Sequence, residues 1–62
     1  MKKGQKFIAS ASTEATPTTT FEYIGINHDA PNPYNVMLLD LEANENYLVS
    51  WAWFRNRYVK LV

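Results

Sequence analysis

Apolar and polar residues alternate in five short segments, and this pattern predicts a chain made mostly of β-strands. The segments are rich in β-branched and aromatic residues and are separated by Gly, Pro, Asn and Asp. We predict strands over residues 5–10, 20–27, 34–42, 46–50 and 58–62. A single 3₁₀ or α turn over residues 51–55 precedes the last strand. An amphipathic helix over residues 48–58 is the alternative, because apolar residues in this stretch also recur at helical spacing.

Alternation within two of these strands predicts which side chains face the core. In segment 34–42, three alternate aliphatic residues are predicted to point inward: Met37, Leu39 and Leu41. Asp40 and Glu42 would then lie on the outer face. In the last strand, Val59 and Leu61 are predicted to point inward and Lys60 outward.

The connections between the strands differ in length and chemistry. Residues 11–19 form a Thr-rich tract with Pro17, which predicts an exposed loop or an irregular hairpin. In residues 28–33 two X-Pro steps exclude both a helix and a strand ladder. Residues 43–45 form a short loop in which Asn44 can adopt the left-handed conformation that closes a hairpin. Gly25, in mid-strand, predicts a bulge or the close approach of another backbone.

This order of strands, long first loop, medium second loop, tight third turn and helical turn resembles the SH3-like small β-barrel across nearly the whole chain. The resemblance implies one all-β domain over residues 1–62, built as a five-stranded barrel. The peptide-binding SH3 signature is different, since this chain has a single Glu in the first loop and carries Trp51 and Trp53 inside the turn. An oligonucleotide-binding (OB-like) barrel and an α+β fold with a short C-terminal helix are the alternatives.

Composition indicates a folded unit with a small core. The chain has 62 residues, of which 47% are hydrophobic and 19% are charged. A domain of this size buries only about 60% of the surface that its unfolded chain exposes. Because there is no Cys and only one His, disulfides, thiolate metal sites and multi-His sites are excluded, and we expect no cofactor. The apolar stretch after Lys6 is too short for a signal peptide, and no run has the length of a membrane span, so we expect a cytoplasmic protein.

The charges are segregated although the formal net charge is zero. Every basic residue lies near an end of the sequence, and every acidic residue lies between the two basic groups. If the first and last strands are neighbours, the basic groups merge into one positive patch that is suited to phosphates. The alternative is that these side chains only solvate the ends and protect a sheet edge. The patch consists of Lys2, Lys3, Lys6, Arg55, Arg57 and Lys60.

The densest aromatic run is Trp51-Ala52-Trp53-Phe54. Three large aromatic residues within four positions cannot all enter so small a core, so at least one indole should stay partly exposed. By strand alternation we predict that Phe54 is the core residue and that Trp53 is exposed. Arg55 and Arg57 flank the run, and Trp, Tyr and Arg are enriched at binding hot spots.

Residues suited to catalysis are few. His28 beside Asp29 is the one candidate general base, and the hydroxyls of Ser10, Ser12 and Ser50 are its candidate partners. Adjacent residues in a Pro-bounded loop rarely face each other in these roles. Asp40 and Glu42 are more consistent with a solubilising strip than with an acid–base pair or a metal site. We therefore predict that the protein is not an enzyme.

The size and style of the chain resemble those of small accessory proteins that bacteriophages encode, with Lys3-Gly4-Gln5-Lys6-Phe7 and Trp53-Phe54-x-x-Arg57 as the sequence content of the resemblance. It implies a module that binds a host or defence protein and blocks or modulates it. The predicted partner-binding residues are Trp51, Trp53, Arg55, Arg57, Tyr58, His28 and Tyr34.

Two other functions are also consistent with the sequence. The first is nucleic-acid binding through Lys2, Lys3, Lys6 and Lys60, with an aromatic residue stacked on a base. The second is an oligomeric sponge for a small anionic ligand. A molecule with segregated charges can also pair head to tail with itself, so a homo-oligomer is a further candidate.

Overall fold

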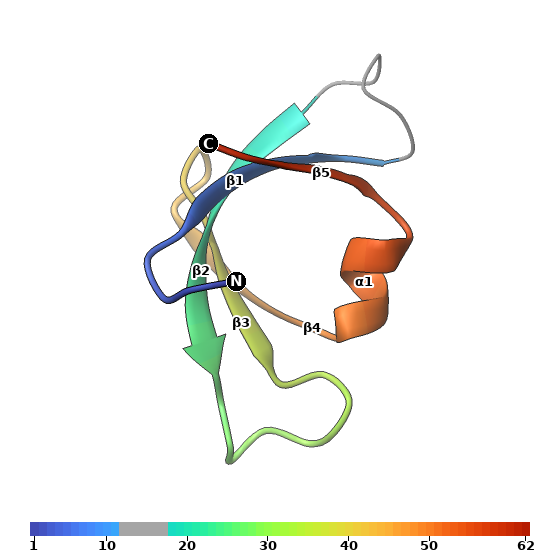
Figure 1. Ribbon diagram of the computed structural model, residues 1–62. Coiled ribbons are helices and arrows are strands. Elements are labelled where there is room, and N and C mark those ends of the chain that lie inside the picture. The colour runs from blue at the N-terminus through green and yellow to red at the C-terminus, as the bar shows by residue number, and fades with distance from the viewer. Residues whose placement is uncertain (12–17) are drawn as a thin grey trace.

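The computed structural model describes residues 1–11 and 18–62 and contains five strands and one short helix in the described part (Figure 1). The predicted helical turn is the helix α1, and the strands lie close to their predicted positions. Strand β2 begins two residues earlier than predicted, and residues 12–17 of the predicted first loop lie outside the described residues. The elements are β1 (Lys6–Ser10), β2 (Thr18–Ile26), β3 (Val36–Asp40), β4 (Glu45–Val49), α1 (Trp51–Arg55) and β5 (Tyr58–Leu61).

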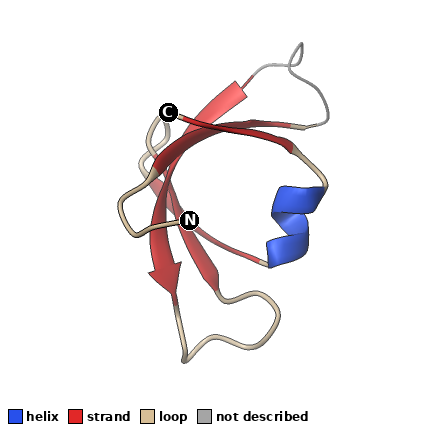
Figure 2. Ribbon diagram, viewed as in Figure 1, coloured by secondary structure: helices blue, strands red, loops and turns tan. Residues whose placement is uncertain are grey.

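The five strands form one antiparallel sheet in the order β4-β3-β2-β1-β5. The sheet curls into an incomplete barrel, and α1 lies at the opening between its two edge strands (Figure 2). The prediction of an all-β small barrel with a helical turn before the last strand is therefore confirmed. The alternative helix over residues 48–58 is wrong, because β4 pairs with β3 up to Val49 and β5 pairs with β1 from Tyr58.

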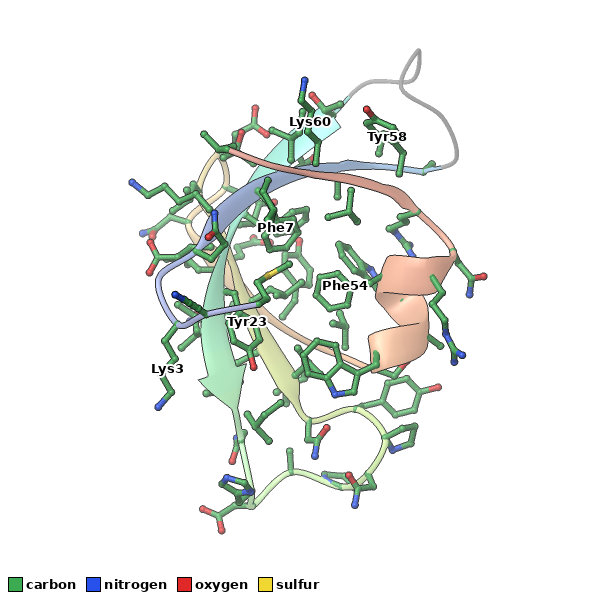
Figure 3. The ribbon with its side chains drawn as sticks, in the orientation of Figure 1. Lys3, Phe7, Tyr23, Phe54, Tyr58 and Lys60 are labelled. Carbon is green, nitrogen blue, oxygen red and sulfur yellow. The ribbon has the colours of Figure 1, made fainter. Side chains whose placement is uncertain are left out.

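Aromatic and aliphatic side chains from the central strands fill the barrel. Phe7, Val36 and Leu38 have no exposed surface. The rings of Phe7 and Phe21, on paired strands, stack with centroids 5.6 Å apart. Figure 3 shows Phe7 and Phe54 pointing into the same interior from opposite walls. The core is continuous from β1 across β2 and β3 to α1.

Strand β3 has the opposite face orientation to the one predicted. Val36, Leu38 and Asp40 are buried, whereas Met37 and Leu39 are only partly covered on the outer face. The strand is apolar on both faces, so its alternation does not identify the inner one.

Asp40 stays buried because its carboxylate is used by the turn that follows. Its Oδ1 accepts hydrogen bonds from the backbone N–H groups of Glu42 (2.9 Å) and Ala43 (3.0 Å). Asn44, with φ of 56°, completes this turn in the left-handed conformation predicted for it. Asp40 and Glu42 therefore differ in surroundings, since Glu42 is exposed and its Oε2 accepts from the Thr20 N–H.

A bulge in β2 confirms the reading of Gly25. The β2–β3 register shifts between Tyr23 and Gly25, and the shift turns Ile26 toward the core. Gly25 has a φ of 138°, a backbone conformation that residues other than Gly rarely adopt. The Lys3 side chain lies over it, 3.0 Å from the position that a Cβ would take.

Strand β5 confirms the inward direction of both predicted residues but packs only one of them against the core. Val59 packs against the core, but Leu61 remains 58% exposed. Leu61 pairs with Phe7 and shares its face, yet β5 is an edge strand of the sheet that the described residues form. The predicted inward direction of Leu61 is right, but its predicted burial is wrong, because the barrel does not close at this edge.

Candidate functional site

The aromatic run places both Trp53 and Phe54 against the core and leaves Trp51 exposed. Since residues 51–55 are helical, alternation by strand rules gave the wrong assignment. Trp53 lies edge-on to Phe21, with centroids 5.4 Å apart, and Phe54 lies 5.6 Å from Phe7. Trp51 is 50% exposed, and its inner edge rests on Tyr23 and Phe54. The prediction that Trp53 is the exposed indole is wrong, whereas the expectation of one partly exposed indole is confirmed.

The loop between β2 and β3 is held by its own hydrogen bonds and presents Tyr34. The N–H of Asn27 donates to the carbonyl of Asn35 (2.8 Å) and closes the loop at its base. Within it, the Asn35 amide donates to the Asn32 side chain (2.8 Å), and the Tyr34 N–H donates to the Pro31 carbonyl (3.0 Å). Tyr34 is 60% exposed on this braced backbone.

A groove of about 390 Å³ lies between this loop and α1. Two exposed apolar side chains line it from different segments, Tyr34 from the loop and Leu48, 47% exposed, from β4. Trp51 stands at the start of the helix that forms the groove's wall. None of the described residues that line the groove is charged, whereas Arg55 is exposed in the last turn of that helix. The lining residues are Tyr34, Leu48, Val49, Ser50, Ala52, Trp53 and Asn56.

The other predicted partner-binding residues lie away from this groove. His28 is exposed just after β2, where the Asn27 side chain accepts a hydrogen bond from the Asp29 N–H. Tyr58 is half-buried on β5, on the same strand face as Lys60 (Figure 3). The structure therefore brings together Tyr34, Trp53 and the start of α1, and leaves His28 and Tyr58 outside.

The basic residues are dispersed over the barrel. Strands β1 and β5 are paired as expected, and Lys60 lies opposite Ile8, diagonal to Lys6 on the outer face. Lys6 is also directly opposite Glu22, which places an acid inside the predicted patch. Lys3 lies over Gly25, on a different side of the molecule from Lys60 (Figure 3). Lys2 is exposed before β1.

Arg57 marks a second hollow, at the opening between β4 and α1. Its guanidinium lies 4.5 Å from the centre of the Trp53 ring, and its Nη1 donates to the Trp53 carbonyl (3.4 Å). This hollow of about 210 Å³ is lined by Phe21, Leu38, Tyr47, Val49, Trp53 and Arg57. Sequence reasoning missed Tyr47, because nothing in the sequence shows that β4 is an edge strand.

Tyr47 is coupled to Glu45 on the same strand face. The phenol donates a hydrogen bond to the Glu45 carboxylate (3.1 Å). This bond, and then the charge of Glu45, raise the pKa of Tyr47 above its ordinary value of 10.0. Because the folded-state pKa is the higher one, the stabilisation from this contact is fully present below pH 10.0 and is lost as the pH rises through the raised value.

We expect Glu45→Gln to lower the pKa of Tyr47 toward its ordinary value, since the substitution removes the carboxylate charge. The measurement is a tyrosinate absorbance titration, in which the difference between each protein and its Tyr47→Phe counterpart isolates this phenol. Glu42→Gln is the control, because Glu42 bonds to Thr20 instead. An equal shift in the Glu42 variant would contradict the assigned cause.

Within residues 1–11 and 18–62, no three His, Cys, Asp or Glu side chains are grouped so that they could hold a metal ion. The same residues include no helix with the length and hydropathy needed to cross a membrane.

In comparisons with protein-family models, with curated proteins and with solved structures, the chain matches none of them.

Proposed function

We propose that the protein is a non-enzymatic protein-binding module, and that its groove between the β2–β3 loop and α1 receives a short segment of a partner protein. The observation that carries the proposal is the pairing of Tyr34 and Leu48, both largely exposed, across one concave surface. Exposed apolar side chains gathered around a depression are typical of interaction sites.

The braced loop supports this function energetically. Hydrogen bonds within residues 27–35 already hold the backbone that carries Tyr34. Binding therefore orders little additional chain, and less of the interaction energy is spent on lost conformational entropy. Trp53 adds a fixed wall, because it is anchored in the core by Phe21 and Phe54.

The charge around the groove indicates the chemistry of the partner. Among the described residues the lining is uncharged and combines apolar side chains with the polar Ser50 and Asn56, and the charged residue in the last turn of α1 is Arg55. We infer a partner segment with an aromatic or aliphatic side chain for the groove and an acidic residue for Arg55. Occupying a partner's surface in this way would block or modulate it, as the resemblance to phage accessory proteins implies.

The first test selects binding peptides from a random library displayed on phage and measures their affinities by titration. We expect enriched peptides to combine an apolar anchor with acidic residues. Tyr34→Ala should weaken the best peptide by about tenfold or more, because the side chain is an exposed part of the groove. Leu61→Ala is the matched control, since Leu61 is similarly exposed on β5 and outside the groove, and it should change the affinity by less than about twofold.

Two outcomes would contradict this function. One is peptide binding that survives Tyr34→Ala. The other is tight binding of a single-stranded oligonucleotide with a steep linear loss of log affinity against log salt, which is the signature of phosphate contacts. The dispersed lysines and the acid opposite Lys6 are the reasons not to expect oligonucleotide binding.

A further inference from the structure

The free edge of β4 differs from the free edge of β5. Both strands end the sheet, and each has one row of backbone N–H and C=O groups that faces no other strand within residues 1–11 and 18–62. Lys60 stands in β5, and a lysine is a common protection against unwanted strand pairing. Strand β4 (Glu45–Val49) has no Lys and no Pro, and its first four residues are exposed. An unprotected edge of this kind is a template for an added strand.

Hydrogen bonds in the sheet show which backbone groups of β4 are free. The Leu41 N–H donates to the Thr20 carbonyl (3.0 Å), so Leu41 directs its backbone groups toward β2. Neighbouring residues of a strand alternate in this direction, so Leu38 and Asp40 bond to β4. Their partners there are Tyr47 and Glu45. The groups left for the free edge are those of Asn46 and Leu48.

These two residues are arranged symmetrically about Tyr47. If β4 pairs antiparallel with β4 of a second copy around a two-fold axis at Tyr47, Asn46 lies opposite Leu48 of the other chain. Each such pair can exchange both of its backbone hydrogen bonds. The two Tyr47 side chains then face each other across the axis, in the closely spaced type of pair that favours aromatic contacts.

The same pairing brings opposite charges together. Glu45 of one chain lies opposite Val49 of the other, on the inner face of β4. Val49 and Arg57 line the same hollow, so this Glu45 arrives beside an arginine. Within the described part of its own chain, neither Glu45 nor Arg57 forms an ion pair: Glu45 accepts from Tyr47, and Arg57 lies on Trp53. Because the dimer is symmetric, this Glu45–Arg57 contact occurs twice.

We propose that two copies of this chain associate through their β4 edges into a two-fold dimer with one continuous ten-stranded sheet (five strands from each copy) and reciprocal Glu45–Arg57 pairs. The dimer would carry two copies of the groove between the β2–β3 loop and α1, so a partner with two binding segments would gain affinity through linkage. The association involves no partner protein, so it stands or falls independently of the proposed function.

The charge test uses sedimentation equilibrium of the full chain at rising concentration. We expect the mass to increase from 7.2 kDa toward twice that value. Glu45→Arg and Arg57→Glu should each raise the dimer dissociation constant by about tenfold or more, because each creates two like-charge contacts. The double variant restores opposite charges and should return the constant to within about threefold of the wild-type value. Circular dichroism of each variant shows that it is folded.

The backbone test uses chains made by chemical synthesis. N-methylation of Leu48 removes an N–H at the free edge and should abolish the dimer without breaking a bond to β3. N-methylation of Leu61 is the matched control: the Val62 N–H donates to Lys6, so by alternation the Leu61 N–H faces the other free edge. A mass of one chain at every concentration overturns the proposal. A failure of the double charge variant to recover, or equal loss from both N-methyl chains, also overturns it.

Discussion

Phe7→Ala is expected to lower the free energy of unfolding by about 3–5 kcal/mol, which is enough to leave a large fraction of the molecules unfolded. Phe7 has no exposed surface and lies at the centre of the aromatic core. Its ring contacts Phe21 (5.6 Å), Phe54 (5.6 Å) and Trp53 (6.5 Å). The Phe7 ring, which β1 carries, contacts Phe21 of β2 on one side and Phe54 of α1 on the other, and the substitution removes both contacts. In a core this small, few other side chains can move to fill the cavity that the substitution leaves.

Urea unfolding followed by circular dichroism measures this effect. Phe7→Leu is the matched variant, because it keeps most of the volume and should cost roughly 1–2 kcal/mol. Ile8→Ala, on the half-covered outer face of the same strand, should cost less than Phe7→Ala. A loss below about 1 kcal/mol for Phe7→Ala would contradict the position of the core.

Trp53→Ala is expected to destabilise the fold by about 3 kcal/mol or more, clearly exceeding Trp51→Ala. The Trp53 ring has three aromatic neighbours and one cation, with centroids 5.4 Å from Phe21, 5.0 Å from Phe54 and 6.5 Å from Phe7, and with Arg57 at 4.5 Å. Trp51 rests on two rings and is half in solvent. Removing the Trp53 side chain would leave a cavity at the opening between β4 and β5, which the indole fills.

Thermal unfolding of the two single variants, followed by far-ultraviolet circular dichroism, compares them directly. Arg57→Ala separates the two parts of the effect, because it removes the cation above the ring and keeps the indole in the core; its cost should stay near 1 kcal/mol or less. Equal stability of the Trp51 and Trp53 variants would contradict the positions of the two indoles.

The strand order and the helical turn were predictable because local chemistry determines them. Runs of β-branched and aromatic residues separated by Gly, Pro and Asn exclude most other secondary structures for a chain of 62 residues. Asn44 adopts the turn conformation foreseen for it, and Gly25 marks the bulge. The pairing of β1 with β5 followed from the resemblance in element order, since no local signal brings the two ends of the chain together.

The faces of β3 and α1 were not predictable from alternation. Val36, Met37, Leu38 and Leu39 are all apolar, so either face of β3 could have been the inner one. The pairing of Leu38 with Tyr23 decides it, together with a turn that needs the Asp40 carboxylate inside. In α1, one helical turn carries Trp53 and Phe54 inward together, and strand alternation cannot describe that.

The candidate site shows the same division. Sequence alone identified Trp53 and the loop that carries Tyr34 as parts of the site, although it wrongly placed the Trp53 indole in solvent. Only the tertiary structure decided that Tyr34 and Leu48 line one groove, that Arg57 covers Trp53, and that β4 is an edge strand. Alternation and turn chemistry act between residues close in sequence, and so the sequence reveals them. Groove walls, edges and charge neighbours depend on which strands pair, and pairing is a property of the whole chain.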